Sequence, residues 1–167
     1  MTPAVTLVFA VTATIGVLQF RLPGLLSLMR PDGTALTHGE WWQLVTPLFV
    51  QDGGWAGTLF NLGTLLALGA VAVETLSWRR WQLLYFGTGI GGGIVVYAWI
   101  PQGFAGNSNA NMDAVAGLAL LALRTSQWRA NVAEAVAFVC GLLLLAAGEL
   151  HGAAFAIGIV VAAITVA

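Results

Sequence analysis

The sequence predicts an all-α, polytopic membrane protein in which residues 1–167 form one domain of six transmembrane helices, with both termini in the cytoplasm. Three observations predict this class. First, 59% of the residues are hydrophobic and only 8% are charged, whereas a typical soluble domain carries about 25% charged residues. Second, the apolar residues fall into six runs of helical length. Third, most of the arginines lie in the loops of one side.

The composition excludes several classes of protein. There is too little charge to cover a water-facing surface or to form a basic patch, so we expect no nucleic-acid partner. The net charge is only -1. Cys140 is the single cysteine, and the sequence contains neither paired Cys or His ligands nor a phosphate-binding loop. We therefore expect no disulfide framework, no metal and no organic cofactor.

The six apolar runs have about the length that a lipid bilayer requires, since a hydrocarbon core of about 30 Å takes roughly 20 residues of helix. The first run lacks a basic start and a small-residue cleavage site, so we expect a retained helix rather than a signal peptide. None of the runs alternates with a period of two, which disfavours strands. The expected spans are residues 2–20, 57–75, 81–100, 109–123, 131–147 and 150–167.

The arginines predict the orientation of these spans. Arg79 and Arg80 lie between the second and third spans, and Arg124 and Arg129 lie between the fourth and fifth. In a six-span chain, these two loops share a side with both termini. Basic residues are enriched in cytoplasmic loops, so we expect both termini in the cytoplasm.

The first loop, residues 21–56, is broken by Pro-Gly and Asp-Gly turns and contains short apolar stretches rich in Trp. Trp is enriched at the level of the lipid headgroups. We interpret these stretches as two short helices lying at the membrane interface. His38 belongs to this loop, and we expect it at the surface.

Three polar residues on separate spans, Asn61, Ser108 and His151, should lie at one depth near the outer side, because spans two, four and six all begin there. Asn61 should lie about 6–8 Å into its span. Each residue also has a structural explanation: an Asn can join two helices, a Ser can cap one, and a His can lie at a hydrated helix end. Together, however, a Ser, a His and an amide are the components of an acyl-transfer site. Other polar residues flank them: Asn107, Asn109, Asn111, Asp113 and Glu149.

Four segments between residues 39 and 167 contain motifs in a fixed order: GEWWQLVTPLF (39–49), GTLFNLGTLLALG (57–69), RRWQLLYFGTGIGGG (79–93) and HGAAFAIG (151–158). Together they resemble the rhomboid family of intramembrane serine proteases. The segment GEWWQLVTPLF (39–49) is similar to the family's first loop, with Gln43 where Arg is usual. GTLFNLGTLLALG (57–69) is similar to the H-x-x-x-N motif of span two, with Asn61 matched and Gly57 in the place of His. RRWQLLYFGTGIGGG (79–93) and HGAAFAIG (151–158) resemble the beginnings of spans three and six.

This resemblance implies a six-helix rhomboid-like bundle that hydrolyses peptide bonds of a transmembrane protein substrate within the lipid bilayer. We expect a plasma-membrane location, and the orientation of the spans places the opening of the site on the outer side. Gly106-Asn107-Ser108-Asn109 matches the family pattern G-x-S-x at span four. On this match, Ser108 is the nucleophile, His151 is the general base and Asn61 donates to the oxyanion.

A second register of the same span leads to a different function. AVAGL (114–118) resembles the sequence after the family's serine, and counting back from Gly117 places Met112 at the nucleophile position. Methionine cannot attack a carbonyl, so this register implies an inactive, rhomboid-like pseudoprotease that binds client membrane proteins. Ser108 and Met112 lie one helical turn apart, and the sequence leaves both registers open. A small transporter also fits the hydropathy, but no polar residue lies mid-bilayer in two matching halves.

Overall fold

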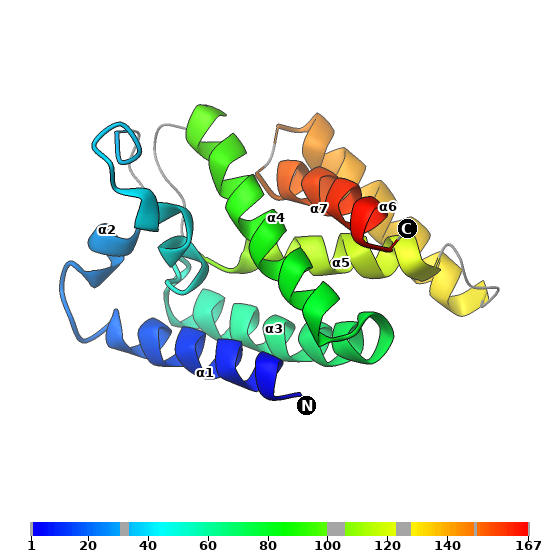
Figure 1. Cartoon of the computed structure of the whole chain (residues 1–167), viewed down its shortest axis with the longest axis horizontal. Coiled ribbons are helices and arrows are strands. Elements are labelled where there is room, and N and C mark those ends of the chain that lie inside the picture. The colour runs from blue at the N-terminus through cyan, green and yellow to red at the C-terminus, as the bar shows by residue number, and fades with distance from the viewer. Residues whose placement is uncertain (1, 31–33, 100–105, 123–127, 149, 167) are drawn as a thin grey trace.

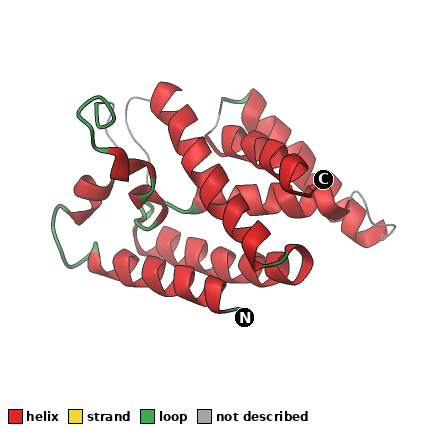
Figure 2. Ribbon diagram, in the orientation of Figure 1, coloured by secondary structure: helices red, strands yellow, loops and turns green. Residues whose placement is uncertain are grey.

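The structure, a computed structural model, describes residues 2–30, 34–99, 106–122, 128–148 and 150–166, and these residues form helices, turns and loops without a strand. Figure 2 shows this all-helical arrangement. The α-helices are α1 (Pro3–Leu18), α2 (Leu25–Met29), α3 (Gly54–Leu76), α4 (Trp78–Trp99), α5 (Ser108–Ala122), α6 (Trp128–Ala146) and α7 (Leu150–Val166), and two short 3-10 helices are η1 (Trp41–Leu44) and η2 (Thr46–Leu48).

Each predicted span coincides with one of the long helices, and the predicted ends differ from the observed ends by three residues or fewer. The helices end where the sequence disfavours their continuation. Pro3 occupies the first turn of α1, where its missing N–H is no loss. Ser77, with φ of 80°, separates α3 from α4. Within its described residues, the first loop contains three short helices, α2, η1 and η2, where two were predicted. Their place at the membrane interface stays a prediction.

Only one helix among the described residues meets a strict test of length and apolar composition for crossing a bilayer, namely the 21 residues Gly54–Glu74 of α3. Three shorter apolar helical stretches accompany it: Pro3–Leu18, Ala110–Leu120 and His151–Ile164. Large apolar side chains nevertheless project outward from several helices, among them Leu7 on α1, Phe60 on α3 and Ile164 on α7. The six-span topology stays a prediction.

Helix α5 lies at the centre of the bundle and contacts α3, α4, α6 and α7. The small residues Ala110, Ala116 and Gly117 of α5 are buried at these contacts. A Cβ at Gly117 would press against the side chain of Leu84 on α4, so glycine lets these two helices approach closely. Figure 1 shows α1 and α3 running side by side, with α4 crossing the bundle.

Helices α6 and α7 pack even more closely, because glycine lies on both sides of their contact. A Cβ at Gly152 of α7 would collide with the backbone of Leu144 and Leu145, and a Cβ at Gly141 of α6 would collide with the ring of Phe155. This close contact fixes the beginning of α7, where Gly152 follows His151.

The beginning of α1 and the end of α7 lie towards the same end of the bundle, and the first loop lies at the opposite end (Figure 1). A chain that crosses a membrane an even number of times must have both of its ends on the same side. Arg79 and Arg80 begin α4 and are exposed. Arg124 and Glu149 lie outside the described residues.

Candidate active site

Ser108 is the first residue of α5, and the chain turns sharply just before it. Gly106 has φ of 121°, a conformation that side chains disfavour, and its N–H donates to the carbonyl of Pro47 at 2.9 Å. A Cβ on Gly106 would lie 3.7 Å from Ser108 Oγ. This turn connects the loop before α5 to the first loop and places the Ser108 hydroxyl at a helix N-terminus, where backbone N–H groups lack helical partners.

His151, the second residue of α7, faces Ser108 across the bundle. Its Nε2 lies 3.2 Å from Ser108 Oγ, which is within hydrogen-bond reach for a nucleophile and its base. Both side chains are partly buried. The structure thus brings together two residues 43 positions apart in the sequence, as the predicted dyad requires.

Asn61 lies on α3 beside these two residues. Because α3 begins at Gly54 rather than at residue 57, Asn61 lies about 10 Å along its helix, deeper than the 6–8 Å expected. Its Nδ2 donates to Gln51 Oε1 at 2.7 Å, and its backbone carbonyl accepts from Asn111 Nδ2 at 3.2 Å. A carboxamide has two N–H groups, so the Gln51 bond uses only one of them.

A cavity of about 150 Å³ lies between α3, α5 and α7, and the side chains of Asn61, Ser108 and His151 line it. Polar groups converge on an otherwise apolar wall, the usual character of a binding site. Its lining residues are Phe60, Asn61, Thr64, Leu68, Ser108, Asn111, Met112, Val115 and His151.

Ser108 and Met112, between which the sequence left the register open, take different positions in the structure. Ser108 lies at hydrogen-bond distance from His151, and Met112 lines the same cavity one turn further along α5. The geometry thus favours the register in which Ser108 pairs with His151, and the choice between the two registers stays a prediction. The side chains of Asn109 and Asp113 lie outside the described set.

Gln51 is the site residue that the sequence analysis missed. It lies between η2 and α3, is 1% exposed, and contacts both Asn61 and Asn107. The only signal in the sequence was a polar residue beside exposed Asp52 in a loop, which is ordinary. His38, in the same loop, is exposed as predicted, and a Cβ at Gly57 would meet no atom within 4 Å.

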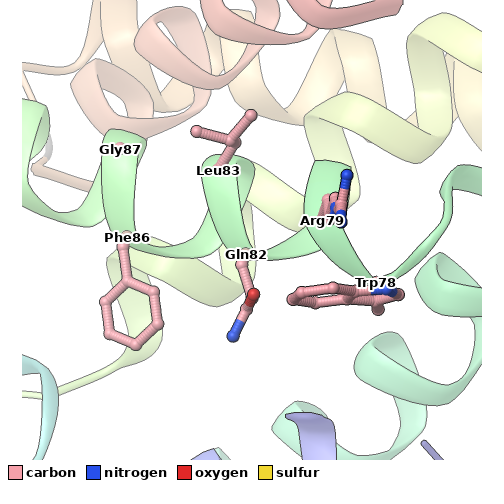
Figure 3. A pocket seen from close by; sticks show the side chains of 6 residues that line it. All are labelled: Trp78, Arg79, Gln82, Leu83, Phe86 and Gly87. Atoms are coloured by element: carbon pink, nitrogen blue, oxygen red, sulfur yellow. The ribbon is translucent and has the colours of Figure 1, made fainter.

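A larger and more open hollow of about 520 Å³ lies on the outer surface of α4, and neither Ser108, His151 nor Asn61 lines it. Figure 3 shows its lining side chains, all from one helix, with the Arg79 guanidinium near the Trp78 ring at 5.3 Å. Within the described residues, no group of three His, Cys, Asp or Glu side chains could hold a metal ion.

Comparison with known proteins agrees with the resemblance seen in the sequence. The Rhomboid domain family matches residues 38–166. The chain is 30% identical over 92 residues to the rhomboid protease GluP of Bacillus subtilis, covering 55% of this chain and 18% of that protein. It is 31% identical over 104 residues to the putative rhomboid protease YdcA of the same organism, covering 59% and 51%. The chain thus spans about half or less of the length of these relatives.

Proposed function

The chain belongs to the rhomboid family, and on that premise we propose that it is an intramembrane serine protease with Ser108 as nucleophile and His151 as general base. Family membership implies an integral membrane protein. The observation that carries the proposal is the 3.2 Å separation between Ser108 Oγ and His151 Nε2, beside a cavity that also contains the Asn61 amide.

In the proposed reaction, Ser108 Oγ attacks the carbonyl carbon of the substrate's peptide bond while His151 Nε2 takes the hydroxyl proton. The carbonyl oxygen becomes an oxyanion, which accepts hydrogen bonds from the Ser108 backbone N–H and from Asn61 Nδ2. Each such donor contributes about 3–4 kcal/mol to transition-state stabilisation. His151 then gives its proton to the leaving amine as the C–N bond breaks.

Water completes the reaction by hydrolysing the acyl-enzyme ester, with His151 again accepting and returning a proton. As the resemblance to the family implies, we assign the base function to a Ser-His dyad without a third acidic member.

We further propose that all six long helices cross the lipid bilayer, with both termini in the cytoplasm. The exposed Arg79 and Arg80 at the beginning of α4 support this orientation. The first loop and the beginnings of α5 and α7 then lie towards the outer side. The substrate class that fits is a transmembrane protein whose helix reaches the cavity from within the bilayer.

A fluorophosphonate probe, which reacts with activated serines, tests the proposal. Wild-type protein in detergent should be labelled, and Ser108→Ala and His151→Ala should not. Ser27→Ala is the matched control: Ser27 is exposed on α2 and donates only to the Gly24 carbonyl, so its loss should leave labelling unchanged.

Cleavage of a transmembrane substrate in proteoliposomes should follow the same pattern as labelling. If wild type and Ser108→Ala are equally unlabelled and equally inactive, the protease assignment fails. The pseudoprotease function, in which the same cavity binds a client helix without cutting it, is then the remaining reading. Gly57 and Gln43, in the places of the family's His and Arg, favour this alternative, as does Met112 if it occupies the nucleophile position.

A further inference from the structure

The backbone of Gln51 is held in place by the end of α1. Gln51 N–H donates to Gln19 Oε1 at 2.8 Å, and Gln19 Nε2 donates to the Gln51 carbonyl at 2.5 Å. A side-chain amide thus pairs with both polar groups of one peptide residue, which fixes that residue as a neighbouring strand would. The backbone position from which the buried Gln51 side chain extends is therefore fixed by Gln19, which lies 32 residues earlier in the sequence.

From that fixed point, the Gln51 carboxamide bonds to the site on two sides. Its Oε1 accepts from Asn61 Nδ2 at 2.7 Å, and its Nε2 donates to Asn107 Oδ1 at 2.9 Å. Asn61 carries the proposed oxyanion donor, and Asn107 immediately precedes Ser108. One buried side chain thus joins α3 to the turn that begins α5.

The packing around Gly106 shows how closely the side chains of this arrangement gather. A Cβ on Gly106 would lie 3.4 Å from Gln51 Oε1, 3.6 Å from Asn61 Nδ2 and 3.7 Å from Ser108 Oγ. The three side chains therefore surround one glycine. A displaced Gln51 carboxamide would release Asn61 and Asn107 together.

We infer that Gln51 is a positioning residue of this site: its carboxamide orients the Asn61 amide towards the oxyanion and holds the Asn107–Ser108 turn in place. The inference rests on the proposed function and extends it to a residue that does not touch substrate. A misplacement of about 1 Å in such a site costs about 10²-fold in rate.

Gln51→Glu provides the sharpest test, because its protonation state can be changed in place. A protonated carboxyl is nearly isosteric with the carboxamide, since it can accept from Asn61 and donate to Asn107. An ionised carboxylate cannot donate, and it puts a negative charge beside a developing oxyanion. Burial raises the pKa of a carboxyl, so the change should occur above the ordinary range of glutamate.

The measurement is kcat and KM for substrate cleavage in proteoliposomes between pH 5 and pH 9, expressed at each pH as the ratio of variant to wild type. The ratio for Gln51→Glu should fall from within about threefold of unity at acidic pH to about 10- to 100-fold below it at alkaline pH. Gln51→Leu, which can neither accept nor donate, should lose kcat about 100-fold at every pH with little change in KM.

Gln43→Leu is the matched control, because Gln43 is another buried glutamine of the first loop. Its Nε2 donates to Glu40 Oε2 and to the Leu28 carbonyl, away from the site. We expect its rate to stay within about twofold of wild type. Thermal unfolding in detergent at each pH confirms that the compared proteins are folded.

The outcomes separate this inference from the proposed function. An inactive wild type defeats the proposed function and, with it, a role for Gln51 in that function. An active wild type with an inactive Ser108→Ala, but with a pH-independent Gln51→Glu ratio or a Gln51→Leu rate near wild type, overturns the inference alone. Failure of both Gln51 variants to fold at any pH also overturns it, in favour of a purely structural role.

Discussion

Replacing Gly152 by alanine should disable the site without altering Ser108 or His151. Gly152 is buried where α7 meets α6, and a Cβ there would collide with backbone atoms of Leu144 and Leu145. Backbone atoms cannot rotate away as the end of a side chain can. The nearest of these atoms would lie 2.0 Å from the Cβ, so restoring ordinary contact at about 3.5 Å requires a separation of about 1.5 Å.

This separation reaches the dyad directly, because His151 precedes Gly152 on α7. A displacement of this size at His151 would break the alignment of its Nε2 with Ser108 Oγ, which lies 3.2 Å away, because hydrogen bonds depend steeply on distance and angle. We expect a loss of about 10²-fold in kcat. Overpacking at such a contact also destabilises the fold by about 1–3 kcal/mol.

The assay is single-turnover cleavage in proteoliposomes, with thermal unfolding measured on the same preparations. Gly63→Ala and Gly87→Ala serve as controls, since a Cβ at either position meets no atom within 4 Å. Both should cleave at the wild-type rate. A Gly152→Ala protein that cleaves within about threefold of wild type would refute this account of how α6 positions His151.

Three further predictions test other features of the site and of its orientation. Gly57→His should fold normally, because the space beside Gly57 is open, and should raise kcat by up to about 10-fold by adding a donor; loss of folded protein would contradict this. Met112→Ala should keep fluorophosphonate labelling and change KM, because Met112 lines the cavity but is not the residue that pairs with His151. Loss of labelling to the level of Ser108→Ala would argue against the assignment of Ser108 as nucleophile. Replacing Arg79 and Arg80 together by Glu should yield mixed membrane orientations, measured by protease protection of a C-terminal tag, and a uniform orientation would count against these arginines as its determinants.

The helices could be predicted from the sequence because apolar runs of helical length leave few alternatives. The family could also be predicted, since the matched motifs occur in the expected order. The match of the Rhomboid domain to residues 38–166 confirms it. The first residue of α3 was less accessible: Gly54, Trp55 and Ala56 form helix before the apolar run becomes continuous. Asn61 therefore lies deeper than counting from residue 57 suggested.

The register of α5 and the role of Gln51 could not be read from the sequence for physical reasons. Ser108 and Met112 are four residues apart and share a helix face, so periodicity cannot choose between them. Which of the two residues faces His151 depends on the turn at Gly106, whose positive φ determines where α5 begins. Gln51 is buried only because Gln19, Asn61 and Asn107 meet there, which is a consequence of tertiary packing.

Helix α5 has 15 residues, which gives it a length of about 22 Å, whereas the hydrocarbon layer is about 30 Å thick. If its inner end is level with the cytoplasmic boundary of that layer, its outer end stops about 8 Å short of the other boundary. The shortfall would set the depth at which the proposed protease cuts. A peptide bond at Ser108 would lie below the lipid surface yet above the bilayer midplane, so a substrate helix would have to uncoil over its outermost turns before it could be cleaved.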